Sequence, residues 1–192
     1  IKMRGLVGLG NPGSNYTNTR HTIGFKIIDA INAHFKLSKQ KPKFKGLLTT
    51  GNIDEKKIYA IKPLTFMNNS GTAIKELIDY FKIDAKDVIV FHDDMDIDFG
   101  KIKAKFGGTS AGHNGIESID KFIGKDYSRV RIGIGHPKQK KKVNNHVLED
   151  FKEDEEEKIK EITENIVKQI PTLIEKKIYQ LSIKVNKNLN VI

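Results

Sequence analysis

The segment RGLVGLGNPGSNYTNTRHTIGF (residues 4–25) decides the fold. It opens with a short, mostly apolar run that stops at the turn sequence Gly10–Gly13, which predicts a buried β-strand over residues 4–9. From Gly24 to Phe35 the apolar side chains recur at helical spacing, so a helix is expected after the loop. A strand, a glycine-rich loop and a helix in this order are typical of a parallel α/β unit.

The alternation of strand and helix patterns continues through most of the chain. Apolar or alternating runs predict further strands over residues 46–52, 57–62, 87–91, 101–106 and 130–134. Helical periodicity predicts helices over residues 70–81, 115–122 and 153–170. Pro171 is expected to kink or end the last of them, before a second helical piece that carries Ile178. We therefore expect an α/β fold, a single domain over residues 1–192 whose twisted, mostly parallel (mixed) central sheet is flanked by helices on both sides.

Loops at the carboxyl ends of parallel strands gather at one edge of a sheet and commonly carry the function. Four loops of this chain qualify, and they span residues 10–24, 63–71, 92–100 and 107–115.

The charge of the chain is concentrated in one region. The net charge is +10, and the segment between Gly100 and His146 contains eleven basic residues but only three acidic ones. A strand over residues 101–106 would place Lys101, Lys103 and Lys105 on one face. This pattern indicates a polyanionic partner such as nucleic acid. A solvated surface in a lysine-rich chain is the alternative that charge alone leaves open.

The composition excludes some classes of site. The chain has no cysteine, which rules out disulfide bonds and thiolate metal ligands. It has no apolar run of about 18 residues, so no membrane-spanning helix is expected. The first residues lack the apolar region of a signal peptide. These features predict a cytoplasmic protein that does not bind membranes.

Two ligand-binding patterns are present but incomplete. Gly8, Gly10 and Gly13 spell the dinucleotide fingerprint G-x-G-x-x-G, but the next helix begins about ten residues too late to meet a pyrophosphate. The acidic triplet DMDID (94–98) resembles the start of a calcium-binding loop, yet the required glycine and glutamate are replaced by Phe99 and Lys105. Neither ligand is expected.

Hydrolytic chemistry remains, and the residues leave its form open. No serine lies in a G-x-S-x-G turn, so a nucleophilic serine is not supported. A metal-dependent phosphoesterase built on His92, Asp93, Asp94 and Asp96 is one alternative. A histidine that activates water, oriented by a carboxylate and surrounded by asparagines, is the other.

The six histidines are not equally suited to that role. His34 lies on a predicted helix and is expected to be structural. Four others, His21, His92, His113 and His136, lie in loops or at the junctions between strands and loops. Spacing alone does not choose among these four.

Four segments together resemble the bacterial-type peptidyl-tRNA hydrolase family. They are GLGNPGSNYTNTRHTIGF (8–25), KPLTFMNNSG (62–71), HDDMDIDFGKIKAKFGGTSAGHNGIESI (92–119) and RVRIGIGHP (129–137). Their order and spacing also fit, and the match covers roughly residues 4–151. The resemblance implies hydrolysis of the ester that joins a peptide to the 3′-terminal ribose of tRNA, which recycles tRNA from peptidyl-tRNA released by ribosomes.

The resemblance also assigns roles to residues at matching positions. It implies that His21 is the general base and that Asp93 orients it. It implies that three asparagines contact the peptide and the reacting carbonyl: Asn11, a candidate catalytic residue, with Asn68 and Asn114. Tyr16 and Phe66 match positions bordering the terminal nucleotide and the peptide, and Met67 matches a supporting wall. Basic positions near the tRNA path correspond to Lys103, Lys105 and Arg131.

The family resemblance implies a monomer whose partner is peptidyl-tRNA and which needs no metal or other cofactor. Residues 138–148 resemble the mobile lid of the family, and residues 153–180 its C-terminal helices. Two positions depart from the usual motifs. Thr22 stands where asparagine is common, and GGTSAGHNG (107–115) differs slightly from GG-x-x-GGHNG. A tRNA-binding protein without turnover is the remaining rival, against which the intact histidine, aspartate and asparagines argue.

Overall fold

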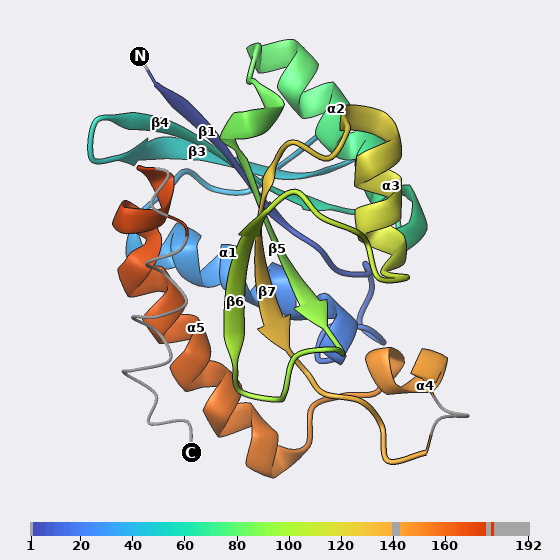
Figure 1. The fold of residues 1–192 in the computed structure, drawn as a ribbon. Coiled ribbons are helices and arrows are strands. Elements are labelled where there is room, and N and C mark those ends of the chain that lie inside the picture. Colours follow the sequence, from blue (N-terminus) through green and yellow to red (C-terminus); the bar gives the residue numbers. More distant parts are fainter. Residues whose placement is uncertain (1, 140–142, 176–177, 179–192) are drawn as a thin grey trace.

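The computed structural model describes residues 2–139, 143–175 and 178 (Figure 1). Seven strands form one sheet in the order β2-β3-β4-β1-β5-β7-β6. The strands are β1 (Met3–Gly8), β2 (Lys41–Lys43), β3 (Gly46–Ile53), β4 (Lys56–Pro63), β5 (Val88–Asp94), β6 (Ile102–Phe106) and β7 (Ser128–Gly133). The central strands β4, β1, β5 and β7 are parallel, whereas β3 and β6 run antiparallel to their neighbours β4 and β7. The expected mixed, mostly parallel sheet is confirmed.

Helices cover both faces of this sheet. They are α1 (Ile23–His34), α2 (Ser70–Phe81), α3 (Asn114–Ile123), α4 (Val143–Leu148) and α5 (Glu153–Ile174). Helices α1 and α5 share one apolar cluster with the sheet, and α2 and α3 share the other (Figure 1). The prediction of one α/β domain with helices on both sides is therefore confirmed.

Strand β1 shows how the sequence builds this sandwich. Successive side chains of a strand point to opposite faces, so Leu6 enters the cluster under α1 and α5 while Val7 enters the cluster under α2 and α3. Both side chains are fully buried. Truncating Leu6 to alanine would cost roughly 2–5 kcal/mol of folding free energy.

Gly8, the first glycine of the sequence that resembles a dinucleotide fingerprint, serves close packing. A Cβ added to Gly24 would lie 2.3 Å from the backbone nitrogen of Leu9, and one added to Gly8 would lie 2.1 Å from the carbonyl oxygen of Gly24. The end of β1 and the start of α1 therefore touch backbone to backbone. This contact fixes the direction of the loop between them, which carries Asn11 and His21.

Four details differ from the sequence prediction. Helix α5 does not end at Pro171 but continues to Ile174. A proline inside a helix costs about 3 kcal/mol, and buried neighbours on both sides, Ile170 and Leu173, hold the helix in place. The strands differ at three points. Strand β5 continues to Asp94 because it stays paired with β7. Strand β2, whose sequence is Lys-Pro-Lys, was not predicted. On the edge strand β6 the alternation does not separate a buried from an exposed face throughout, because Phe106 at its end is exposed.

Two predicted segments are only partly described. Residues 143–148 of the predicted lid form the short helix α4, and residues 140–142 lie outside the described part. Of the second helical piece, Leu173 and Ile174 belong to α5 and Ile178 is buried, whereas residues 176, 177, 179 and 180 lie outside the described part. Within the described residues, no helix combines the length and apolarity needed to cross a membrane.

Candidate active site

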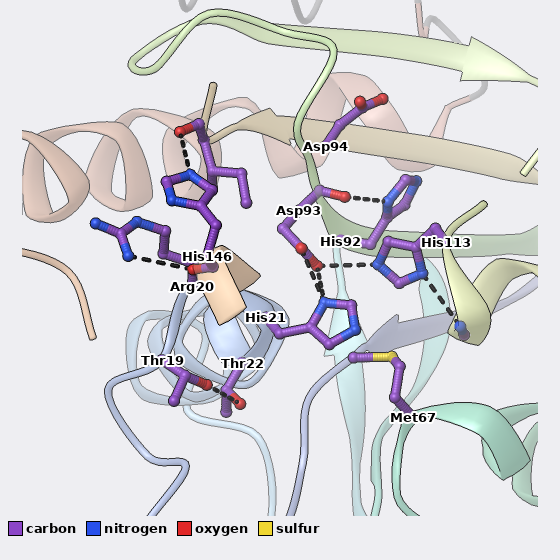
Figure 2. A network of polar contacts seen from close by, with 12 residues as sticks. Thr19, Arg20, His21, Thr22, Met67, His92, Asp93, Asp94, His113 and His146 are labelled. Carbon is purple, nitrogen blue, oxygen red and sulfur yellow. Dashed lines mark hydrogen bonds and ion pairs between the residues drawn. The ribbon is translucent and has the colours of Figure 1, made fainter. Parts of the chain in front are cut away.

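His21 and Asp93 meet where the carboxyl ends of β1 and β5 lie side by side. His21 lies in a 3-10 turn (Arg20–Thr22) that leads into α1, and Asp93 lies near the end of β5. The Nδ1 atom of His21 is 2.9 Å from Oδ1 and 2.8 Å from Oδ2 of Asp93 (Figure 2). Both residues are buried. The pair that the resemblance implied is thus brought together.

The turn that carries His21 is tied to the C-terminal part of the fold. The guanidinium of Arg20, itself buried, donates 2.9 Å to the carboxylate of Glu155 and 3.2 Å to the carbonyl of His146. Thr19 forms an isolated β-bridge with Asp150. His21 therefore lies in a segment that is held from two sides, which limits its conformational freedom.

The electrostatics of the pair favour a charged aspartate and a basic imidazole. Burial by itself lowers the pKa of His21, but the charge of Asp93 and its hydrogen bond outweigh that effect and raise the pKa above its ordinary value. Burial likewise tends to raise the pKa of Asp93, yet His21 and His113 hold it far below its usual range. Asp93 is therefore ionised, and its oxygens can only accept hydrogen bonds.

A second histidine binds the same carboxylate. The Nε2 atom of His113 lies 2.9 Å from Oδ1 of Asp93 (Figure 2). Its Nδ1 accepts hydrogen bonds from the backbone N–H groups of Gly115 and Ile116, at 3.2 Å and 3.3 Å, and so caps helix α3. Gly115 lets α3 approach Met67 closely, because a Cβ there would lie 2.4 Å from the sulfur of Met67 and would displace it.

His92 lies behind this cluster. Its Nδ1 donates to the backbone carbonyl of Asp93 at 2.8 Å, and its ring meets that of His113 edge to face at 5.0 Å. Burial, together with the charges of His113 and Arg129, holds the pKa of His92 well below the ordinary value. His92 is therefore neutral and serves as part of the wall.

The described residues contain one group of three possible metal ligands, namely His21, Asp93 and His113. The hydrogen bonds argue against a metal ion there. Because Nδ1 of His113 accepts two backbone N–H groups, the ring proton must lie on Nε2, the atom that would have to bind the metal. The acidic residues expected for a phosphoesterase have other partners: the carboxylate of Asp94 accepts the backbone N–H of Asp96, and the carboxylate of Asp96 pairs with His136.

Asn11 is oriented by two backbone contacts. Its Oδ1 accepts the N–H of Met67 at 2.9 Å, and its own backbone N–H donates to the hydroxyl of Thr22 at 3.2 Å. Since Oδ1 is engaged, the amide Nδ2 is the group left to act as a donor. Thr22, which replaces the usual asparagine, thus supports the loop of Asn11.

A pocket of about 410 Å³ opens beside His21. Its lining includes His21 with Asn114 from the start of α3, and Lys105 and Arg131 from the neighbouring strands β6 and β7. Helix α4, in the predicted lid, contributes Asn144 and Val147.

Four of the remaining predicted residues, Tyr16, Phe66, Asn68 and Lys103, lie outside the lining of this pocket. The rings of Tyr16 and Phe66 meet edge to face at 6.3 Å, and Phe66 is half exposed with an unusual φ of +61°. Asn68 is exposed in the next turn. Lys103 is exposed on β6, outside the lining of the pocket.

Sequence reasoning missed two residues that hold the site, His113 and Arg20. His113 had been left open among four histidines, and its distance of 20 positions from Asp93 gave no sign of contact. No role was predicted for Arg20 individually. The sequence did offer one signal for both residues. Arg20 lies in residues 8–25 and His113 in residues 92–119, which are two of the four segments that carry the family resemblance.

Comparisons with known proteins agree with this geometry. Residues 5–191 match the family model described as peptidyl-tRNA hydrolase. The peptidyl-tRNA hydrolase of Pelagibacter ubique (strain HTCC1062) is 69% identical over 181 residues, which are 94% of this chain and 97% of that protein. That of Ehrlichia ruminantium (strain Welgevonden) is 51% identical over 146 residues, or 76% of each chain. The crystal structure of peptidyl-tRNA hydrolase from Acinetobacter baumannii has a TM-score of 0.89 at 33% identity and covers 96% of this chain and 94% of its own. The chain belongs to the bacterial-type peptidyl-tRNA hydrolase family.

Proposed function

We propose that this protein hydrolyses the ester between a peptide and the 3′ end of tRNA, with His21 as the general base. The observation that carries the proposal is the hydrogen bond from Nδ1 of His21 to Asp93. Because the ionised carboxylate only accepts, the neutral imidazole keeps its proton on Nδ1 and its lone pair on Nε2.

In the first step, Nε2 of His21 takes a proton from a water molecule, which attacks the ester carbonyl carbon. Asp93 holds the ring in this tautomer and stabilises the imidazolium that forms. The tetrahedral intermediate then collapses, and the imidazolium returns the proton to the departing ribose oxygen. General-base help of this kind contributes about 10²–10⁴-fold in rate.

The asparagines supply uncharged hydrogen bonds around the carbonyl. With Oδ1 of Asn11 held by Met67, its Nδ2 is a suitable donor to the developing oxyanion, and Asn114 is the second candidate. One such donor is worth roughly 3–4 kcal/mol. In this proposal Asn68 binds the peptide backbone. A site that pairs with an amide rejects a free α-ammonium, which favours peptidyl over aminoacyl esters.

The tRNA is proposed to approach from the β6–β7 edge. Lys103, Lys105 and Arg131 lie on these two strands, where Lys103 and Arg131 are opposite each other. Their contacts with phosphates would give affinity that falls with salt. Tyr16 and Phe66 would border the terminal nucleotide and peptide. We further propose that the protein acts as a monomer in the cytoplasm, without a cofactor or a membrane partner, and that helix α4, the described helix of the predicted lid, covers the pocket.

Hydrolysis of an N-acetylated aminoacyl-tRNA in oxygen-18 water tests this function. The label is expected in the carboxylate of the released N-acetyl amino acid, and the tRNA is expected to leave intact with an unlabelled 3′ hydroxyl. Label in a phosphate, or shortened tRNA, would instead support the phosphoesterase. A protein that binds this substrate but releases no amino acid would be the binding module without turnover.

A further inference from the structure

His113 lies between two parts of the site that must keep a fixed distance. On one side its Nε2 reaches Oδ1 of Asp93 at 2.9 Å. On the other side its Nδ1 accepts the amides of Gly115 and Ile116 in the first turn of α3. The residue between, Asn114, is the first residue of that helix and lines the same pocket as His21. One imidazole ring therefore links the carboxylate to the helix that presents Asn114 (Figure 2).

The hydrogen bonds determine which nitrogen of His113 carries the proton. Two backbone N–H groups point at Nδ1, so this atom needs a lone pair, and the proton of the neutral ring lies on Nε2. Nε2–H then donates to Asp93. The His113 ring thus accepts hydrogen bonds from helix α3 at Nδ1 and donates one to the carboxylate of Asp93 at Nε2.

We propose that His113 is a positioning residue for the reaction. It orients Asp93, determines how strongly the Asp93 carboxylate attracts the proton of His21, and holds Asn114 at a fixed distance from Asp93 and His21. The inference rests on the proposed role of His21 as the base. It assigns His113 no contact with the substrate.

The second donor limits what Asp93 does to His21. The carboxylate shares its Oδ1 between Nδ1 of His21 and Nε2 of His113. A hydrogen bond from His113 spreads part of the negative charge of Asp93 and weakens its pull on the imidazolium form of His21. Without this bond the base would hold its proton more tightly, and a larger share of it would be protonated near neutral pH.

Other charged and titratable groups lie around Asp93 and His21 and contribute to the electrostatics of the pair. His92 lies beside Asp93 on β5, and its ring contacts that of His113. The charged residues that line the pocket are Lys105 from β6, Arg129 and Arg131 from β7, Asp94 at the end of β5 and Asp96 after it. Helix α4 contributes only uncharged residues, namely Val143, Asn144 and Val147. His113 differs from all of these groups in bonding directly to the side chain of Asp93, as His21 does.

The substitution His113→Asn separates the two contacts of the ring. Residue 113 is the N-cap of α3, with φ −73° and ψ 111°, and asparagine is among the best N-cap residues. Its side chain can replace the cap but is too short to reach Asp93. His113→Ala removes both contacts. His136→Asn is the matched control, because His136 is an exposed histidine that also pairs with an aspartate, Asp96.

The measurement is the pH dependence of kcat and KM on an N-acetylated aminoacyl-tRNA, together with an NMR titration of the His21 ring in the free protein. For His113→Asn we expect kcat to fall about 10-fold or more near neutral pH, a loss of the size seen when an orienting partner is removed elsewhere. KM should change little. The acid limb of the profile and the NMR midpoint of His21 should both move to higher pH, and His136→Asn should match wild type.

Several outcomes would overturn the inference. If the role of His113 were purely structural, His113→Asn would lower the melting temperature and reduce kcat by the same factor at every pH, without moving the NMR midpoint of His21. A wild-type midpoint in a folded His113→Asn variant would also contradict it, as would an NMR spectrum that places the His113 proton on Nδ1. The proposed function fails separately, through a His21 variant that keeps its activity.

Discussion

Nδ1 of His21 lies 2.8 Å from Oδ2 of Asp93, although 72 positions separate the two residues in the chain. The parallel pairing of β1 with β5 makes this contact possible, because it brings the loop after β1 to the end of β5. The buried carboxylate fixes the imidazole with its lone pair on Nε2 and raises the pKa of His21.

Replacing Asp93 with asparagine should move the acid limb of kcat/KM to lower pH. Burial lowers the pKa of His21 and Asp93 raises it, so without the charge only the lowering effect remains. The rate should fall at all pH values, because asparagine does not fix the tautomer, but by less than the roughly 10²–10⁴-fold of general-base catalysis. Asp79→Asn, which removes an exposed carboxylate paired with Lys75, is the control. A limb that stays in place would contradict the electrostatic account of the pair.

Neutralising the basic residues of β6 should reduce the salt dependence of binding. Each of Lys103→Ala and Lys105→Ala removes one proposed phosphate contact, so the slope of log affinity against log salt should fall by about 0.7–0.9. Lys105 also lines the pocket and should affect KM more than Lys103 does. Lys39→Ala, an exposed lysine away from this edge, should leave the slope unchanged. Unaltered slopes in both variants would remove these two residues from the tRNA path.

Treatment with a chelator should leave the rate of hydrolysis unchanged. The hydrogen-bond pattern puts the ring proton of His113 on the nitrogen that a metal ion would need. Assays with and without EDTA, followed by addition of Mg²⁺ or Zn²⁺, test this expectation. Loss of activity in EDTA that a metal restores would support the phosphoesterase instead.

Ala111→Gly should stabilise the protein. In GGTSAGHNG, Ala111 is the residue that departs from the usual GG-x-x-GGHNG, and its φ of +48° lies in the left-handed region. This conformation costs a residue with a Cβ about 1–2 kcal/mol, and the greater freedom of glycine in the unfolded chain offsets part of the gain. We expect a net gain of up to ~1 kcal/mol in thermal or urea unfolding. Ala33→Gly, at an exposed position in α1, should show the opposite sign.

The architecture was predictable because patterns of burial repeat locally. Strand β1 and helix α1 follow directly from apolar runs and spacing, and the alternation of such units determines the class of fold. The exceptions have nonlocal causes. Helix α5 passes through Pro171 because packed neighbours hold it, and β5 runs past its apolar part because β7 continues the ladder.

The site was predictable only where a motif could be matched. His21 could not be distinguished from three other histidines by spacing, and its partner Asp93 was one acid in a run of four. The contact of His113 with Asp93 depends on the distance between β5 and α3, which no local pattern encodes. The same holds for Arg20, whose hydrogen bonds reach residues more than a hundred positions away.

Single-turnover hydrolysis of N-acetylated aminoacyl-tRNA by His21→Asn tests the central claim most directly. Asparagine is uncharged and similar in shape to the histidine ring, but it cannot accept a proton at neutral pH. We expect the rate to fall roughly 10²–10⁴-fold, while affinity for uncharged tRNA and the melting temperature stay near wild type. His34→Asn, which alters an exposed histidine at the end of α1, should hydrolyse the substrate normally. A folded His21→Asn variant that cleaves at a rate close to wild type would contradict the assignment of His21 as the base.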